Sequence, residues 1–259
     1  MTQAITRFAP SPTGYLHLGH VRNAIEVWNF ARDHGARVLL RIEDHDRQRC
    51  KPEYEAAIRE DLAWLGFVPD EEVPRQSERD AAYREALAPL IAQGLIYGCS
   101  CARAEIINYH YSGKCRNLTI GLRDDVVWRV RMDPGVELFQ DLRMGRQAQD
   151  PSAQVGDFPV RDRLGNWTYQ WAATIDDFLQ GVTHVIRGED LLDSTGRQIR
   201  LARLAGRAEP ATFLHHGLIM EPDGRKLSKS NNATGIRDLR ARGLTKERVF
   251  SMALQGEGS

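Results

Sequence analysis

The chain has 259 residues, of which 42% are hydrophobic and 27% charged, the balance of a globular protein rather than of a fibrous, disordered or membrane one. Thirty-five basic residues offset thirty-five acidic ones, so overall charge favours neither a nucleic acid nor an acidic ligand, and partners must be recognised at local sites. No apolar run approaches the ~20 residues of a membrane span, and the N-terminus lacks a signal-peptide layout, so we expect a cytoplasmic protein with no membrane partner.

The N-terminal part predicts a unit of strand, helix and strand. Residues 4–9 are typical of a strand, apolar residues recur at helical spacing over 18–33, and residues 37–42 predict a second strand. The helix is expected to end at Gly35, which suits a C-cap. Two strands joined by a helix in this way imply parallel pairing with a right-handed crossover.

Further helices are predicted near 53–65 and 78–93, after which residues 99–165 contain only short strand-like runs. The pattern then returns to regular elements, which we expect to be a helix over 169–178, a strand over 182–186 and a helix over 194–205. We therefore predict an α/β fold with a Rossmann-type doubly wound parallel sheet, an inserted β-rich subdomain and a short helical C-terminal region.

The segment between the first strand and the first helix carries a candidate phosphate site. It reads Pro-Ser-Pro-Thr-Gly-Tyr-Leu and continues as His17-Leu-Gly19-His20. In an open α/β sheet, ligands bind at the carboxyl ends of strands, and the N–H groups at a helix start attract phosphate. His17 and His20 lie three residues apart on one side of the first turn and can donate to phosphoryl oxygens, while Gly19 lets a flat ligand approach the backbone.

A second candidate site is the sequence Lys226-Leu-Ser-Lys229-Ser230, which follows the turn residues Pro-Asp-Gly. Two ammonium groups and two hydroxyls suit the charge of a departing pyrophosphate, although such a sequence alone is also typical of a solvated basic loop. From Arg187 onward the chain has thirteen basic and nine acidic residues. This small excess directs an anionic partner toward the C-terminal third.

Taken together, the two motifs resemble the two signatures of class I aminoacyl-tRNA synthetases. The sequences Arg7-Phe-Ala-Pro-Ser-Pro-Thr-Gly, Arg41-Ile-Glu43-Asp44 and Arg187-Gly-Glu-Asp190 resemble the glutamyl branch of that family. The resemblance covers most of the chain. It implies activation of glutamate by ATP, with Mg²⁺ on the pyrophosphate, to glutamyl-adenylate, followed by transfer to a tRNA hydroxyl.

Glutamate has two carboxylates and one ammonium, so its pocket needs guanidinium groups and an acid. Arg7 and Arg187 can clamp carboxylates in a bidentate manner, and Glu43 can hold the ammonium. The resemblance adds a pocket-lining tyrosine and two turn residues, and assigns catalysis and ATP binding to the two motifs. The implied glutamate-binding residues are Arg7, Ala9, Ser11, Glu43, Tyr169 and Arg187; the catalytic residues are His17, His20, Lys226 and Lys229; and the ATP-binding residues are His17, Gly19, His20, Asp190 and Lys229.

Three of the four cysteines, Cys99, Cys101 and Cys115, fall within seventeen positions. In a cytoplasmic chain this spacing favours one structural Zn²⁺ over disulfides, with free thiols as the alternative. Zinc usually takes four ligands, and His110 is chemically the commoner type for the fourth, whereas the resemblance implies Tyr111, four residues before the last cysteine. We expect Tyr111. Cys50 is far from these three cysteines in the sequence, and we interpret it as an incidental thiol.

Only 29 residues follow Ser230, and on this basis we expect no separate anticodon-binding domain. Short glutamyl-like chains with these cysteines resemble ligases that load glutamate onto queuosine, the modified anticodon base of tRNA(Asp), rather than onto the 3′ end. The implied partners are glutamate, ATP and the queuosine-bearing anticodon stem-loop, and we expect a monomer. The alternatives are a truncated glutamyl-tRNA synthetase with an anticodon-binding partner, a small-molecule adenylyltransferase and a non-catalytic RNA-binding paralogue.

The resemblance also divides the chain into four segments. The expected divisions are the first half of the Rossmann catalytic domain at 1–98, an inserted zinc-containing subdomain at 99–165, the second half of the catalytic domain at 166–210 and a lysine-loop and helical stem-contact region at 211–259.

Overall fold

The computed structural model describes residues 3–106, 110–220 and 235–255. The chain forms two compact units. The first unit comprises Met1–Ser77, Val182–Leu192 and Thr212–Ser259, and the second comprises Glu78–Gly181 and Asp193–Ala211. The four segments expected from the sequence stay a prediction. They were defined by the function expected of each segment, whereas the two units are defined by which residues pack together.

The first unit is built on parallel strands. Strand β1 (Ile5–Phe8) pairs with β2 (Arg37–Leu40), β2 pairs with β3 (Glu71–Glu72), and β9 (His184–Gly188) pairs with β10 (Thr212–His216). The backbone N–H of Thr183 donates to the carbonyl oxygen of Ile5 at 2.9 Å, which places β9 alongside β1. The order β3-β2-β1-β9-β10 changes its direction of winding between β1 and β9, where doubly wound sheets bind their ligands. The predicted α/β fold class is confirmed.

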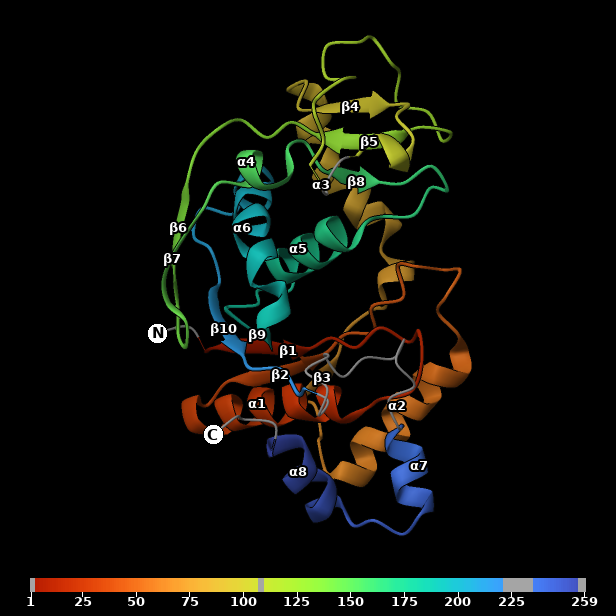
Figure 1. Ribbon diagram of the computed structural model, residues 1–259, viewed down its shortest axis with the longest axis vertical. Helices are drawn as coiled ribbons and strands as arrows, with labels where there is room; N and C mark the ends of the chain where they lie inside the picture. Colours follow the sequence, from red (N-terminus) through yellow and green to blue (C-terminus); the bar gives the residue numbers. More distant parts are fainter. Residues whose placement is uncertain (1–2, 107–109, 221–234, 256–259) are drawn as a thin grey trace. The chain divides into compact units, whose positions relative to one another are not determined.

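In the described residues of this unit, the α-helices are those labelled α1, α2, α7 and α8 in Figure 1. Their bounds are α1 (Leu18–His34), α2 (Pro52–Leu65), α7 (Ile236–Ala241) and α8 (Lys246–Leu254), and the short helices η1 (Gln76–Glu78) and η3 (Glu189–Ser194) span the unit's boundaries. Helix α1 ends where Gly35 adopts φ 62°, and α2 where Gly66 adopts φ 84°, a left-handed conformation that glycine adopts without steric cost.

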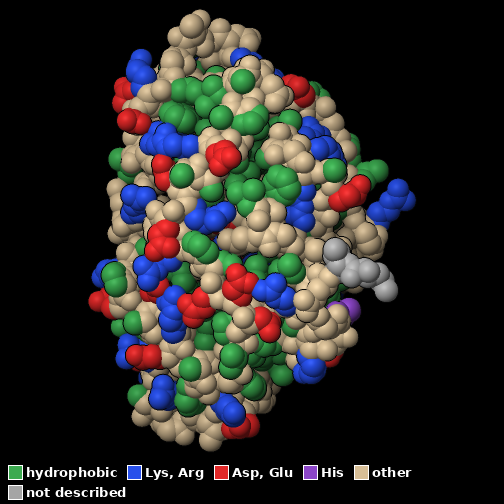
Figure 2. Space-filling view, turned by 180° about the vertical axis from the view of Figure 1, so that it is seen from behind, with side chains coloured by type: hydrophobic (Ala, Val, Ile, Leu, Met, Phe, Trp, Pro, Cys, Tyr) green, Lys and Arg blue, Asp and Glu red, His purple; other side chains and the backbone are tan. Residues whose placement is uncertain are grey.

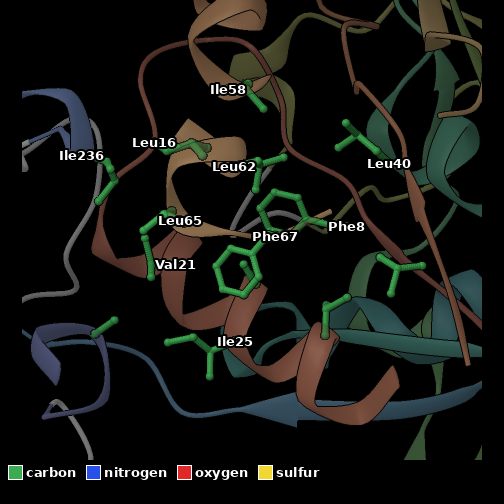
Figure 3. Close-up of a cluster of buried hydrophobic side chains, with 14 of the residues drawn as sticks. Phe8, Leu16, Val21, Ile25, Leu40, Ile58, Leu62, Leu65, Phe67 and Ile236 are labelled. Carbon is green, nitrogen blue, oxygen red and sulfur yellow. The ribbon is translucent and has the colours of Figure 1, made fainter. Parts of the chain in front are cut away.

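Apolar side chains of these strands and helices form one buried core (Figure 3). Phe8 and Leu40 come from the strands, and both are at most 2% exposed. The helices contribute Val21 and Ile25 from α1, Ile58, Leu62 and Leu65 from α2, and Ile236 from α7, and the other two labelled side chains, Leu16 and Phe67, lie just before α1 and just after α2. This packing fixes the carboxyl ends of β1 and β2 relative to the start of α1.

The second unit combines helices with antiparallel strands. Its helices are α3 (Asp80–Ala92), α4 (Pro151–Val155), α5 (Tyr169–Leu179) and α6 (Thr195–Leu204), with the short helix η2 (Arg103–Glu105). Strands β4 (Ile96–Cys99), β5 (Val127–Val130) and β8 (Pro159–Arg161) form one sheet, and β6 (Glu137–Asp141) and β7 (Gly145–Gln149) form a hairpin. Trp171 and Tyr83 are completely buried in its core, where the Tyr83 hydroxyl donates to Asp176 at 2.7 Å.

Most elements with a clear apolar period were predicted close to their observed bounds, including β1, α1, β2, α2, α5 and α6. The hairpin β6–β7 was not predicted, because Leu138 on β6 and Val136 just before it are apolar and more than half exposed, which obscures the alternation that marks a strand. In the described part of the chain, no helix is both long and apolar enough to cross a membrane.

Candidate functional site

The turn after β1 holds its two histidines against each other. His17 is the N-cap of α1, and its Nδ1 accepts from the backbone N–H of Gly19 at 3.1 Å. His20 Nδ1 accepts from the backbone N–H of His17, also at 3.1 Å, and the two ring centroids are 4.0 Å apart. A nitrogen that accepts from an amide carries no proton, so the proton of each neutral ring is on Nε2. Each ring is therefore set to donate through Nε2.

Gly19 is needed for this arrangement. A methyl group at that position would lie 2.9 Å from Cε1 and 3.1 Å from Nδ1 of His17. Both distances are too short for ordinary contact, so any side chain would push the His17 ring off the cap. The structure thus gives Gly19 an intramolecular reason for its small size, and the predicted approach of a flat ligand stays a prediction.

Three charged side chains of the predicted amino-acid pocket lie at the carboxyl ends of neighbouring parallel strands. Arg7 is on β1, Glu43 follows β2, and Arg187 is on β9. They are 5%, 6% and 4% exposed, and charged side chains that are buried this deeply need hydrogen-bonding partners. The Arg7 guanidinium donates to the carbonyl oxygen of Ile186 at 3.2 Å. Buried guanidinium groups and a carboxylate at one sheet edge are suited to binding a zwitterionic ligand.

The remaining predicted residues have different surroundings. Ala9 and Ser11 are partly buried, and Ser11 Oγ lies 3.8 Å from Cys50 Sγ. Asp190 is exposed and its carboxylate lies over Gly188, where a methyl group would be 2.5 Å from Oδ1. Tyr169 is the first residue of α5, in the second unit, and is partly buried. Lys226 and Lys229 lie outside the described residues.

The three clustered cysteines converge in the second unit. The Sγ atoms of Cys99, Cys101 and Cys115 lie within 4.8 Å of one another, and all three residues are buried. Cys101 and Cys115 approach to 3.5 Å between sulfur atoms. Three buried thiols at this spacing are consistent with a metal site.

Of the two candidates for a fourth ligand, Tyr111 lies inside the cluster. Its hydroxyl oxygen is 3.5 Å from Cys99 Sγ and accepts from the backbone N–H of Cys115 at 2.8 Å, and the residue is 3% exposed. His110 is exposed and is not among the groups whose ligand atoms converge. The Arg129 guanidinium lies 3.9 Å from the centroid of the Tyr111 ring, a contact that holds the ring in place.

The surroundings of the cluster shift the pKa values of Cys101 and Cys115 in opposite directions. Burial, followed by the hydrogen bond with Cys115, raises the pKa of the Cys101 thiol to about 12. Burial by itself would also raise the pKa of Cys115, but hydrogen bonds, beginning with the backbone N–H of Ser100, outweigh it and lower that pKa to about 7. A cation bound beside the thiols would favour their charged forms.

The comparisons with known proteins agree with this geometry. The family model of the class I tRNA synthetases for E and Q, catalytic domain, matches residues 3–255. Glutamyl-Q tRNA(Asp) synthetase of Bordetella bronchiseptica is 45% identical over 90% of this chain and 76% of its own length, and that of Pseudomonas fluorescens is 45% identical over 87% and 76%. The chain belongs to the glutamyl-Q tRNA(Asp) synthetases. It is thus a ligase of the class I aminoacyl-tRNA synthetase type.

A solved structure supports the same fold. The glutamate tRNA ligase of Elizabethkingia meningosepticum, crystallised with its amino acid, superposes with a TM-score of 0.77 at 32% identity. The match covers 94% of this chain and 54% of the ligase, so the chain spans about half the length of that enzyme. The shared half is the catalytic fold described above.

Two buried partners of the predicted pocket were given no role in it by the sequence analysis, although Arg41 belongs to a sequence that carries the resemblance. Arg41, completely buried on the segment after β2, donates through Nη2 to Glu43 Oε1 at 3.0 Å. His215 accepts from Arg187 Nε at 3.0 Å, because β9 and β10 place these residues opposite each other. The i, i+2 spacing of Arg41 and Glu43 could have indicated the first pair, but nothing local indicated the second.

Next to the phosphate turn, a cavity of about 620 Å³ opens within the first unit. Pro12 belongs to the turn, and Asp44 and Ser77 form part of the wall, where Ser77 donates to Asp44 through both its N–H and its hydroxyl. The charged residues of the lining are Arg47, Lys51, Arg59 and Arg75 against Asp44 and Glu55. Cations outnumber carboxylates, so this cavity favours anions.

Proposed function

We propose that this chain activates glutamate with ATP and transfers the glutamyl group to the queuosine base in the anticodon of tRNA(Asp), not to the tRNA 3′ end. The observation that carries the proposal is the set of buried charges at the edge of the first unit's sheet, Arg7, Glu43 and Arg187, in a chain whose relatives are glutamyl-Q tRNA(Asp) synthetases. These charges match the two carboxylates and the ammonium of glutamate.

In this proposal Arg7 and Arg187 each bind a carboxylate, and Glu43 binds the ammonium. Both hydrogen bonds from Arg41 to Glu43 end on Oε1, and we assign Oε2 to the ligand's ammonium. The His215 contact fixes the plane of the Arg187 guanidinium, so little side-chain freedom is lost on binding. Ala9 and Ser11 are assigned to the same pocket, and the resemblance to the glutamyl branch assigns Tyr169 to glutamate as well.

The first chemical step is an in-line displacement at the α-phosphate of ATP. A carboxylate oxygen of glutamate forms the new bond to phosphorus, and the bond to the bridging oxygen breaks, so pyrophosphate leaves. His17 and His20, donating through Nε2, bind phosphoryl oxygens, and Lys226 and Lys229 offset the charge of the departing pyrophosphate. Gly19 and Asp190 are assigned to ATP, which binds with Mg²⁺.

In the second step a hydroxyl oxygen of the queuosine cyclopentenediol attacks the carbonyl carbon of the adenylate. The bond from that carbon to the phosphate oxygen breaks and AMP leaves, while the hydroxyl proton passes to an oxygen of the AMP phosphate. No general base from the chain is needed for this balance, because the leaving phosphate accepts the proton.

The buried thiols are assigned to one structural Zn²⁺. Cys99, Cys101 and Cys115 would supply three sulfur ligands and Tyr111 the oxygen, a set that fits the four-coordinate preference of zinc. A bound ion would stabilise the fold around β4 and take no part in either chemical step.

The experiment that tests the function separates the two acceptors. The purified chain is given ATP, Mg²⁺ and glutamate with an anticodon stem-loop of tRNA(Asp), which has no 3′ acceptor end, carrying either queuosine or guanosine. We expect glutamylation of the queuosine stem-loop only, and glutamate-dependent pyrophosphate exchange without any RNA. Charging of full-length tRNA without queuosine would instead indicate a truncated glutamyl-tRNA synthetase.

A panel of amino acids in the exchange reaction distinguishes the other classes. Exchange with glutamate alone excludes a small-molecule adenylyltransferase. Failure to exchange with any amino acid would overturn the proposal and leave a non-catalytic RNA-binding paralogue.

A further inference from the structure

The start of α7 is fastened to the turn that carries His17. Gly235 is the first described residue after the lysine motif, and the next residue, Ile236, donates its backbone N–H to the carbonyl oxygen of Leu16 at 2.8 Å. The side chains of Leu16 and Ile236 are buried in the same core cluster of the first unit (Figure 3). Main chain and core packing therefore join the phosphate turn to the beginning of α7.

Two side chains extend this junction to the surface. The Arg237 guanidinium carbon lies 5.2 Å from the ring centroid of Tyr15, and the Tyr15 ring meets Tyr54 of α2 edge-on at 5.0 Å. A guanidinium over an aromatic face is attracted by the ring's quadrupole, and the edge-on contact holds the Tyr15 ring in position. Arg237 thus contacts a residue only two positions before His17.

We propose that Tyr15 and Arg237 are positioning residues for adenylate formation, because their contact holds the beginning of α7 against the turn that presents His17 and His20 to the phosphates. This inference rests on the proposed function, in which the two histidines bind the triphosphate. Neither Tyr15 nor Arg237 is among the residues assigned to a substrate, so the contact is expected to affect the chemical step and not the affinity for glutamate.

The test compares variants of the full chain in glutamate-dependent pyrophosphate exchange. Arg237→Gln and Tyr15→Leu are each expected to lower kcat by about three- to tenfold with an unchanged KM for glutamate, since misplacement of a catalytic group acts on the chemical step. Tyr15→Phe and Arg237→Lys keep the ring and the charge, and should restore most of the activity. The double variant should lose no more than the greater single loss, because the two residues form one contact.

A matched control lies on the same helix. Arg240 makes the same kind of contact, 5.7 Å from the ring centroid of Trp64 on α2, but does not touch the turn. We expect Arg240→Gln to keep the wild-type kcat while shifting Tm about as much as Arg237→Gln does. An equal loss of kcat in Arg240→Gln would overturn the inference, because it would report a general weakening of α7.

The remaining outcomes separate the two proposals. Wild-type protein that fails to exchange with glutamate overturns the proposed function. An active wild type together with fully active Arg237→Gln and Tyr15→Leu variants overturns the positioning role alone.

Discussion

At the scale of single residues, Asp61 on α2 is a carboxyl group that is buried without hydrogen bonds. It is completely buried, and neither carboxylate oxygen has a hydrogen-bond partner. Burial raises its pKa to about 6, against the attraction of Arg237 and Arg240 and with a small repulsion from Glu60. The charged form of Asp61 therefore opposes folding.

We predict that replacing this carboxyl group by an amide stabilises the protein at neutral pH. The pKa of Asp61 is higher in the folded state than its ordinary value of 3.8, so the wild-type free energy of unfolding falls as pH rises from about 4 to about 6. Asp61→Asn removes this penalty, and should gain roughly 1–3 kcal/mol above that range and nothing near pH 3.5. Urea unfolding of the wild type and of Asp61→Asn at several pH values measures the difference in their free energies of unfolding. A gain that is independent of pH would contradict the prediction.

At the scale of elements, the thiol cluster joins Cys99, at the end of β4, to Cys101 and Cys115, which precede β5 in the chain. We predict that the purified protein holds about one zinc per chain and that removing it with a chelator lowers Tm before it lowers glutamate-dependent exchange, because the ion would stabilise the fold around it. Cys101→Ser should lose the metal, whereas Cys50→Ser, which alters a thiol outside the cluster, should retain it. Elemental analysis beside thermal unfolding measures both; wild type without metal would contradict the assignment.

The elements that the sequence predicted best are those whose position depends on local signals. His17 before an apolar helical period and Gly35 after it mark both ends of α1, and the short apolar run over 37–42 marks β2. The contact of Arg187 with His215 depends on the register of β10 against β9, and that of Arg237 with Tyr15 joins residues more than 200 positions apart. No local pattern predicts such contacts, because long-range packing decides them.

At the scale of the whole molecule, the balanced charge of the chain limits which of its groups can contribute to the affinity for RNA. Lys and Arg side chains alternate with Asp and Glu over the visible face (Figure 2), in keeping with a net charge of zero. Such a surface does not steer a polyanion as a whole, so affinity for phosphates must come from local groups. The cavity beside the phosphate turn is one such place, because its lining cations Arg47 and Lys51 are exposed.

We therefore predict that Arg47→Gln combined with Lys51→Gln weakens binding of the queuosine stem-loop. The loss of two phosphate contacts should also make the affinity less dependent on salt, with the slope of log K against log salt reduced by about 2. Glutamate-dependent exchange without RNA should stay at the wild-type level. The matched control, Arg32→Gln combined with Lys114→Gln, removes the same charge at exposed residues that are already paired with Asp33 and Glu105. An equal loss of affinity in the control would contradict the prediction, because Arg32 and Lys114 do not line the cavity and their effect would show that the RNA responds only to net charge.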